Sequence, residues 1–129
     1  MKRLIPLLFL PLSLIACADS EINCINPVNT QEMRQCAEKN SNQMKGELKE
    51  LESRIILALV DYSGKESSDQ FIALQKKWES FIELQCDNVR GLYGRGSLAG
   101  ISYINCKNKY LEYRVKDLSS IYNEVISVE

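Results

Sequence analysis

Apolar residues recur at steps of three and four positions along three long segments of the chain, which is the spacing of one face of an α-helix. The first helix is predicted to start at a capping box, Asn29 to Glu32. It is predicted to end near Gly64, because glycine tolerates the left-handed conformation found beyond helix ends. Its apolar stripe consists of Met33, Cys36, Ala37, Met44, Leu48, Leu51, Ile55, Leu59 and Tyr62.

Two further helices follow. The second is predicted to start at another capping-box pattern, Ser67 to Gln70, and the third to run from Leu98 or Ile101 to Val125. The stripe of the second helix consists of Phe71, Leu74, Trp78, Phe81, Ile82, Gln85 and Val89, which assigns Trp78 to the core. Between these helices, Gly91 to Gly100 contains four glycines, each of which costs about 1 kcal/mol inside a helix. This segment is therefore predicted to be a loop.

No segment alternates apolar and polar residues in the manner of a β-strand. We therefore predict an all-α, three-helix, disulfide-stapled domain after a cleaved N-terminal signal peptide. The short connection near Gly64 predicts that the first two helices are antiparallel neighbours. With 45% hydrophobic and 26% charged residues, the composition is that of a folded domain.

The first residues have the features of an export signal. Lys2 and Arg3 precede an apolar run that is shorter than the roughly 20 residues a membrane-spanning helix needs. Leu14 to Cys17 resembles the lipobox of bacterial lipoproteins, which favours cleavage before Cys17 and acylation of its thiol. The alternative is ordinary cleavage after Ala18, which would release a soluble protein.

Cleavage before Cys17 divides the chain into a signal peptide over 1–16, an arm over 17–29 and a helical domain over 30–129. The signal carries two of the 16 basic residues and none of the 17 acidic ones, so the formal charge of the mature chain is −3. This charge argues against nucleic acid as a partner. By resemblance to Gram-negative lipoproteins, an aspartate two positions after the cysteine, rather than directly after it, favours the outer membrane. Contact with the membrane is expected through the lipid anchor only.

Four cysteines remain after Cys17. An even number in a small exported domain predicts two disulfides, each contributing about 3 kcal/mol. Of the three possible connectivities we favour the local one, Cys24–Cys36 with Cys86–Cys106. A zinc site is disfavoured because the chain contains no histidine and no Cys-x-x-Cys pair.

Three motifs in order resemble the LprI-like lysozyme-inhibitor family of small exported bacterial proteins. The first is the segment Thr30 to Ala37, which includes Cys36. The second consists of Gln75, Trp78, Phe81 and Cys86, and the third of Gly96, Ser97 and Cys106. The resemblance covers about residues 23–118 and implies a four-cysteine helical domain that binds a lysozyme. The chain departs from the family's pattern at Lys45, Lys49, Glu52 and Ile82.

The glycine-rich loop is the predicted contact surface, because it presents Tyr93, Arg95 and Ser97 beside a disulfide. Catalysis is not expected, since the chain has no histidine base, no Gly-x-Ser-x-Gly elbow and no phosphate-binding loop. No cofactor and no metal are expected. We therefore expect a binding protein of the bacterial envelope that inhibits lysozyme or another peptidoglycan hydrolase. The alternatives are a structural or adaptor lipoprotein without inhibitory activity, and an immunity-type inhibitor of a toxin.

Overall fold

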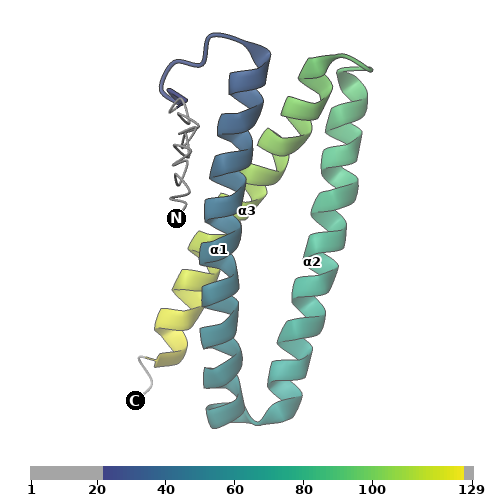
Figure 1. Ribbon diagram of the computed structural model, residues 1–129. Coiled ribbons are helices and arrows are strands. Elements are labelled where there is room, and N and C mark those ends of the chain that lie inside the picture. Colours follow the sequence, from purple (N-terminus) through teal and green to yellow (C-terminus); the bar gives the residue numbers. More distant parts are fainter. Residues whose placement is uncertain (1–21, 127–129) are drawn as a thin grey trace, which may run out of the picture.

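The structure is a computed structural model that describes residues 22–126, and it consists of three helices in these residues, with no strand (Figure 1). They are α1 (Thr30–Ser63), α2 (Lys65–Leu92) and α3 (Ser97–Ile126). The predicted all-α class is therefore confirmed. None of the described helices is both long and apolar enough to span a bilayer. The predicted signal peptide and Cys17 lie outside the described residues.

The predicted capping box starts α1. The Asn29 Oδ1 atom accepts a hydrogen bond from the Glu32 N–H at 2.9 Å, and Glu32 Oε2 accepts one from the Val28 N–H at 2.9 Å. These bonds satisfy backbone donors at the helix start that have no partner within the helix. The helix ends as predicted at Gly64, whose φ of 83° lies in the left-handed region.

Since Gly64 alone separates them, α1 and α2 run side by side in opposite directions (Figure 1). α3 starts beside the end of α2 and crosses behind α1, so that its last turns lie on the other side of α1 from α2. It packs more extensively on α1 than on α2. The core follows this arrangement, because its buried cluster of Leu48, Ile55, Leu111 and Leu118 comes from α1 and α3 alone.

The predicted start of the second helix is wrong, because α2 begins at Lys65 rather than near Ser67. Ser68 does not act as a cap there. Its hydroxyl donates back to the Lys65 carbonyl at 3.1 Å inside the first turn, and Lys65 pairs with Asp69 at 2.5 Å. The polar residues Ser67 to Gln70, which predicted a helix start, therefore lie inside α2.

The predicted buried face of the second helix is displaced by one position. Gln75 is buried, whereas its neighbour Leu74 and the aromatic Phe81 are more than half exposed. Trp78 is partly buried and packs against the core cluster, as predicted. The displacement has a polar cause, since Gln75 makes hydrogen bonds to both other helices.

The predicted loop from Gly91 to Gly100 is also wrong in extent, because the connection between α2 and α3 covers only 93–96. Gly91 lies in the last turn of α2, and Gly100 lies in the first turn of α3. The helix-interior cost of glycine is smaller at a helix end, where backbone groups lack helical partners in any case. Only Gly94 of this connection has a positive φ, 69°.

Candidate binding surfaces

Two disulfides hold one end of the helical bundle. Cys24 bonds to Cys36 with a Cα–Cα distance of 5.5 Å, and Cys86 bonds to Cys106 with a Cα–Cα distance of 5.6 Å. These are the two predicted pairs. The first ties the arm back onto α1, and the second ties the last turns of α2 to the third turn of α3. The segment that joins α2 to α3 is thereby closed at both sides.

The connection over 93–96 is compact and ordered by its backbone. The Tyr93 N–H donates to the Arg90 carbonyl at 3.1 Å, and the Gly94 N–H donates to the Gly91 carbonyl at 3.2 Å. Tyr93 and Arg95 are exposed on this connection, and Ser97 is exposed as the first residue of α3. The structure thus brings the three predicted contact residues to the same end of the bundle.

Arg95 differs from the other arginines of the described residues, each of which forms an ion pair. Within residues 22–126 no side chain or carbonyl forms a hydrogen bond or an ion pair with its guanidinium. By contrast, Arg90 pairs with Asp87 at 2.7 Å, and Arg34 pairs with Glu38 at 3.0 Å. Arg95 is therefore the cation at this end that is free to meet an external anion.

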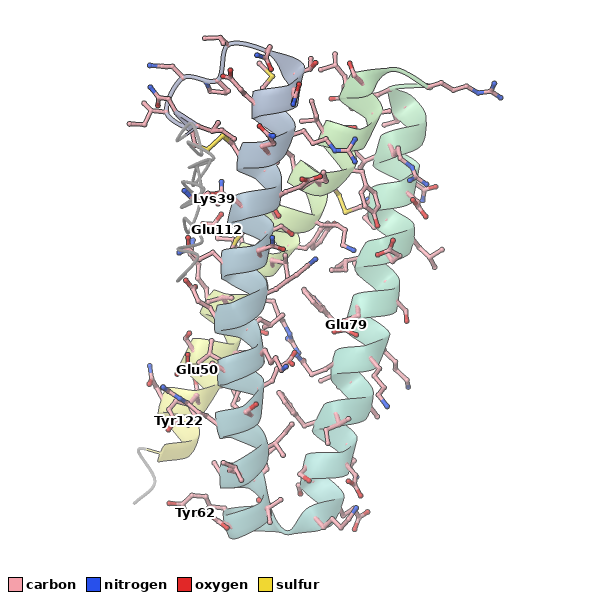
Figure 2. The ribbon with its side chains drawn as sticks, viewed as in Figure 1. Lys39, Glu50, Tyr62, Glu79, Glu112 and Tyr122 are labelled. Atoms are coloured by element: carbon pink, nitrogen blue, oxygen red, sulfur yellow. A yellow bond between two sulfur atoms is a disulfide. The ribbon has the colours of Figure 1, made fainter. Side chains whose placement is uncertain are left out.

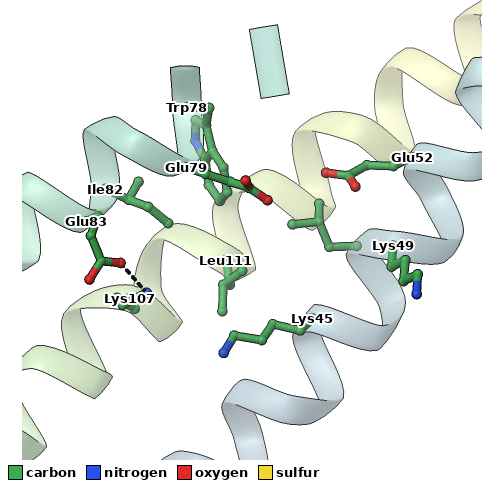
Figure 3. Close-up of a pocket in the computed structure, with 10 residues that line it drawn as sticks. Lys45, Lys49, Glu52, Trp78, Glu79, Ile82, Glu83, Lys107 and Leu111 are labelled. Carbon is green, nitrogen blue, oxygen red and sulfur yellow. Dashed lines mark hydrogen bonds and ion pairs between the residues drawn. The ribbon is translucent and has the colours of Figure 1, made fainter. Parts of the chain in front are cut away.

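A groove of about 520 Å³, which sequence reasoning did not find, lies between α1 and α2 (Figure 3). α1 contributes Lys45 and Lys49, α2 contributes Trp78 and Glu79, and Leu111 of α3 lies at its floor. A second hollow of about 460 Å³ adjoins it and shares Lys45 and Lys107. The sequence contains little indication of this groove. Its apolar lining residues belong to the predicted core stripes, and its charged lining residues only flank those stripes.

Glu83 of α2 anchors a polar cluster beside the groove. Its carboxylate pairs with Lys107 of α3 at 2.6 Å (Figure 3). It also accepts a hydrogen bond from the Tyr103 hydroxyl. The hydrogen bonds from Lys107 and Tyr103 hold the pKa of Glu83 below its ordinary value. Burial lowers the pKa of Lys107, but its hydrogen bonds to Glu83 and Tyr103 outweigh this effect and raise it. The cluster therefore keeps the pair ionised at neutral pH.

A second polar cluster joins all three helices near the middle of the bundle. The buried Gln75 amide donates to Glu52 of α1 and accepts from Arg114 of α3. Arg114 also pairs with Asp117 at 2.5 Å, and its guanidinium lies 5.6 Å from the ring centroid of Trp78. Because each amide end has a partner on a different helix, Gln75 fixes how the three helices are aligned.

None of these clusters of described residues has the composition of a metal site. Within residues 22–126 no group of three or more histidine, cysteine, aspartate or glutamate side chains is placed to hold a metal ion. The four cysteines in this range are consumed in disulfides.

Residues 23–118 match the family described as lysozyme inhibitor LprI. The chain belongs to this family. No curated protein and no solved structure gives a significant match. The match covers α1, α2, both disulfides and α3 as far as Leu118. LprI is an inhibitor family, which agrees with a protein that acts by binding another protein.

The LprI motifs can now be placed in the fold. Cys36, Cys86 and Cys106 form the disulfides, and Gln75 and Trp78 of the second motif belong to the polar cluster that joins the helices. These motif residues therefore support the scaffold. The four departures from the family's pattern share one location, since all of them line the groove between α1 and α2: Lys45, Lys49, Glu52 and Ile82.

Proposed function

We propose that this protein is exported to the bacterial envelope, where it binds and inhibits a lysozyme or another peptidoglycan hydrolase. The match to the lysozyme-inhibitor LprI family over residues 23–118 is the observation that carries this proposal. Cysteine usage supports export, because two disulfides persist in an oxidising compartment. A formal charge of −3 on the mature chain favours approach to a basic hydrolase.

In this proposal the contact is made by Tyr93, Arg95 and Ser97. Glycoside hydrolases hold a pair of carboxyl groups beside the bond they cleave. An exposed guanidinium without a partner in its own protein meets such a pair without first breaking an internal ion pair. The short connection and the Cys86–Cys106 disulfide hold Arg95 in place before binding, which reduces the entropy lost in the complex.

The test is the inhibition constant of Arg95→Ala in a turbidity assay of cell-wall lysis. Removing a central arginine from an interface commonly costs about 2 kcal/mol, which is a roughly thirtyfold loss of affinity. Arg54→Ala is the matched control, since Arg54 is a half-exposed arginine in the middle of α1 that pairs with Glu50. We expect the control to inhibit like the parent protein. Full inhibition by Arg95→Ala, or no inhibition of any hydrolase by the parent at micromolar concentration, would contradict the proposal.

One observation favours a second candidate, an adaptor lipoprotein of the envelope without inhibitory activity. The groove between α1 and α2 contains the four departures from the family's pattern named above. If the family's activity resides in that groove, this chain has lost it and retains the scaffold. Restoring the family residues, through Lys45→Asp with Ile82→Arg, would then create inhibition that the parent lacks.

The proposed location rests on Cys17, which we propose is acylated and anchors the protein to the outer membrane facing the periplasm. Several acyl chains at about 0.8 kcal/mol per buried CH₂ form a stable anchor. Cys17→Ala is expected to lose fatty-acid labelling and to move from the membrane fraction to the soluble fraction. An unlabelled parent protein would instead indicate simple secretion.

A further inference from the structure

Charged side chains of opposite sign lie at different places in the groove between α1 and α2. Lys45 of α1 extends in the direction of Lys107, whereas Glu52 and Glu79 point toward one another across the groove (Figure 3). We call Lys45 and Lys107 the basic end, and Glu52 and Glu79 the acidic end. Between the two ends the groove has an apolar floor, which consists of the buried side chains Leu48, Ile82 and Leu111.

The two ends continue into neighbouring hollows. The hollow of about 460 Å³ that shares the basic end is also lined by Arg34 and Arg90. A smaller hollow of about 210 Å³ shares the acidic end and is also lined by Lys76. The described residues show no ion pair between Lys76 and Glu79. The groove is therefore longer than the space drawn in Figure 3, and cations predominate toward its basic side.

Most charged groups along the groove already have a partner within the protein. The pairs are Glu83 with Lys107, Arg34 with Glu38, Arg90 with Asp87, and Glu52 with Gln75. Three charged groups that line the hollow of about 520 Å³ have no partner within residues 22–126, namely the ammonium groups of Lys45 and Lys49 and the carboxylate of Glu79. All three side chains are exposed, so each can meet an ion of a ligand without first breaking an internal pair.

The dimensions of this hollow match a short peptide. Lys45 and Glu52 are seven positions apart on α1, which corresponds to about 10 Å along the helix axis. An extended peptide covers that length with about three residues. A volume of about 520 Å³ lies within the range of small-molecule sites, which are typically apolar with a few polar groups that fix the orientation.

We propose that the groove binds a short extended peptide, with its N-terminal ammonium between Glu52 and Glu79 and its carboxylates at Lys45 and Lys49. Two free cations face one free anion, so the site favours a peptide with more carboxylates than ammonium groups. The stem peptides of the bacterial cell wall, which contain D-glutamate and a diamino acid, have this excess. The choice of a cell-wall peptide rests on the export in the proposed function, whereas the site is separate from Arg95.

The charges that carry this proposal distinguish the chain from its family. Lys45, Lys49 and Glu52 all depart from the family's pattern, and so does Ile82 in the apolar floor. An arginine at position 82 would place a cation over that floor, and an aspartate at position 45 would reverse the charge of the basic end. The proposed site is therefore a property of this chain and separate from the inhibition that gives the family its description.

The test is calorimetric titration of the mature protein at low ionic strength. The probe is the tripeptide L-alanyl-γ-D-glutamyl-meso-diaminopimelate, which has three carboxylates and a free N-terminal ammonium. We expect saturable binding, with an affinity about fivefold lower for Lys45→Gln and for Glu79→Gln. The matched control is Lys39→Gln, because Lys39 lies on the side of α1 away from α2 (Figure 2). It should bind within twofold of the parent.

Two modified probes test the orientation of the peptide. N-acetylation removes the N-terminal ammonium, so Glu79→Gln should no longer change the affinity for the acetylated peptide, while Lys45→Gln should still lower it. The tripeptide with L-lysine in place of diaminopimelate lacks one carboxylate and should bind more weakly. If Glu79→Gln weakens the acetylated and the free peptide equally, the proposed orientation is wrong.

The outcomes separate this inference from the proposed function. Absence of saturable binding at millimolar peptide, or binding that neither Lys45→Gln nor Glu79→Gln changes, would overturn the inference and leave hydrolase inhibition standing. A parent that binds the peptide as described but inhibits no hydrolase would support the inference while the proposed function fails. If the peptide does not bind and both groove variants instead weaken hydrolase inhibition, the groove belongs to a protein interface and the inference is wrong.

Discussion

The two ends of the bundle are built in opposite ways. The end at which α1 turns into α2, residues 61–69, contains four charged residues: Asp61, Lys65, Glu66 and Asp69. Tyr62 marks this end in Figure 2. It has no disulfide, and Gly64 alone makes the turn. We call the segments 22–29 and 91–98, at the opposite end, the disulfide-held end. These segments contain one charged residue, Arg95, and the three most exposed large apolar residues of 22–124. Both disulfides lie in or beside them.

The contrast in charge and apolar exposure between the two ends indicates that one end is built only to fold and that the other is also built to bind. At the end where α1 turns into α2, which we call the hairpin end, polar residues face water. Leaving them exposed costs little free energy, so this end needs no disulfide. At the disulfide-held end the apolar side chains of Ile25, Val28 and Leu92 bury little area and contribute little to folding. The disulfides therefore hold segments whose exposed apolar side chains are available to contact a partner protein.

The largest effect is expected on removing the Cys86–Cys106 disulfide. A loop of this length contributes about 3 kcal/mol by restricting the unfolded chain. Cys86→Ala with Cys106→Ala should therefore lower the melting temperature by 10 °C or more in circular dichroism. Inhibition at a temperature where the variant is still folded should also weaken, because the connection that carries Arg95 is no longer clamped. A variant that melts within 3 °C of the parent would contradict this role.

In the half of α2 near the hairpin, Gln75 takes the place of a disulfide as the link between helices. Gln75→Ala leaves the buried ends of Glu52 and Arg114 without their shared partner. We expect a loss of about 2 kcal/mol in the free energy of unfolding, measured by urea titration. The disulfide-held end should keep its structure, so the inhibition constant of the folded variant should not change. Gln75→Glu is a useful companion, because its carboxylate still accepts from Arg114 but repels Glu52.

Each end has one glycine with positive φ, and the two glycines make a matched test of the comparison. Gly64 at 83° and Gly94 at 69° have open space where a β-carbon would be placed. An alanine at either position therefore meets only the backbone cost of a positive φ, about 1–3 kcal/mol. This cost is expected to be larger at Gly64, because its ψ of 174° gives a combination that is essentially confined to glycine. We expect Gly64→Ala to be destabilised at least as much as Gly94→Ala, with weaker inhibition for Gly94→Ala alone. Equal inhibition by both variants would remove the functional difference between the ends.

The smallest effect is expected at Glu83, whose pKa is lowered in the folded protein by Lys107 and Tyr103. A lowered pKa stabilises the fold above the ordinary carboxyl pKa, and this stabilisation is lost as the pH falls through the folded value. Glu83→Gln should lower the melting temperature by about 2–4 °C at pH 7, because exposed pairs contribute little. The difference should shrink as the pH falls below the ordinary carboxyl pKa, and it should be lost once the pH lies below the lowered pKa of the folded protein. A constant difference from pH 7 to pH 3 would show that the carboxylate charge is not its source.

Much of this fold follows from local sequence patterns. The capping box at Asn29, the stop at Gly64 and the two local cysteine pairs depend on residues close together in the chain, so they could be predicted. The burial of Gln75 could not, since a polar residue appears as a gap in an apolar stripe until its partners on other helices are known. The groove between α1 and α2 depends on the oblique path of α3, which no local pattern encodes.

Some of the exposed residues at the disulfide-held end could be predicted from the sequence, and others could not. Tyr93, Arg95 and Ser97 were found because glycines and a cysteine surround them. Ile25 and Val28 escaped because an isolated apolar residue between turn formers gives no sign of whether it is buried. Their exposure could be known only from the fold.

The most direct test of the disulfide-held end as the binding surface is hydrogen exchange on the complex with the most tightly inhibited hydrolase. Backbone amides over 91–98 should exchange more slowly in the complex than in the free protein. Amides over 61–69, at the hairpin end, should exchange at the same rate in both. Protection confined to the groove residues of α1 and α2, or to the hairpin end, would contradict the assignment.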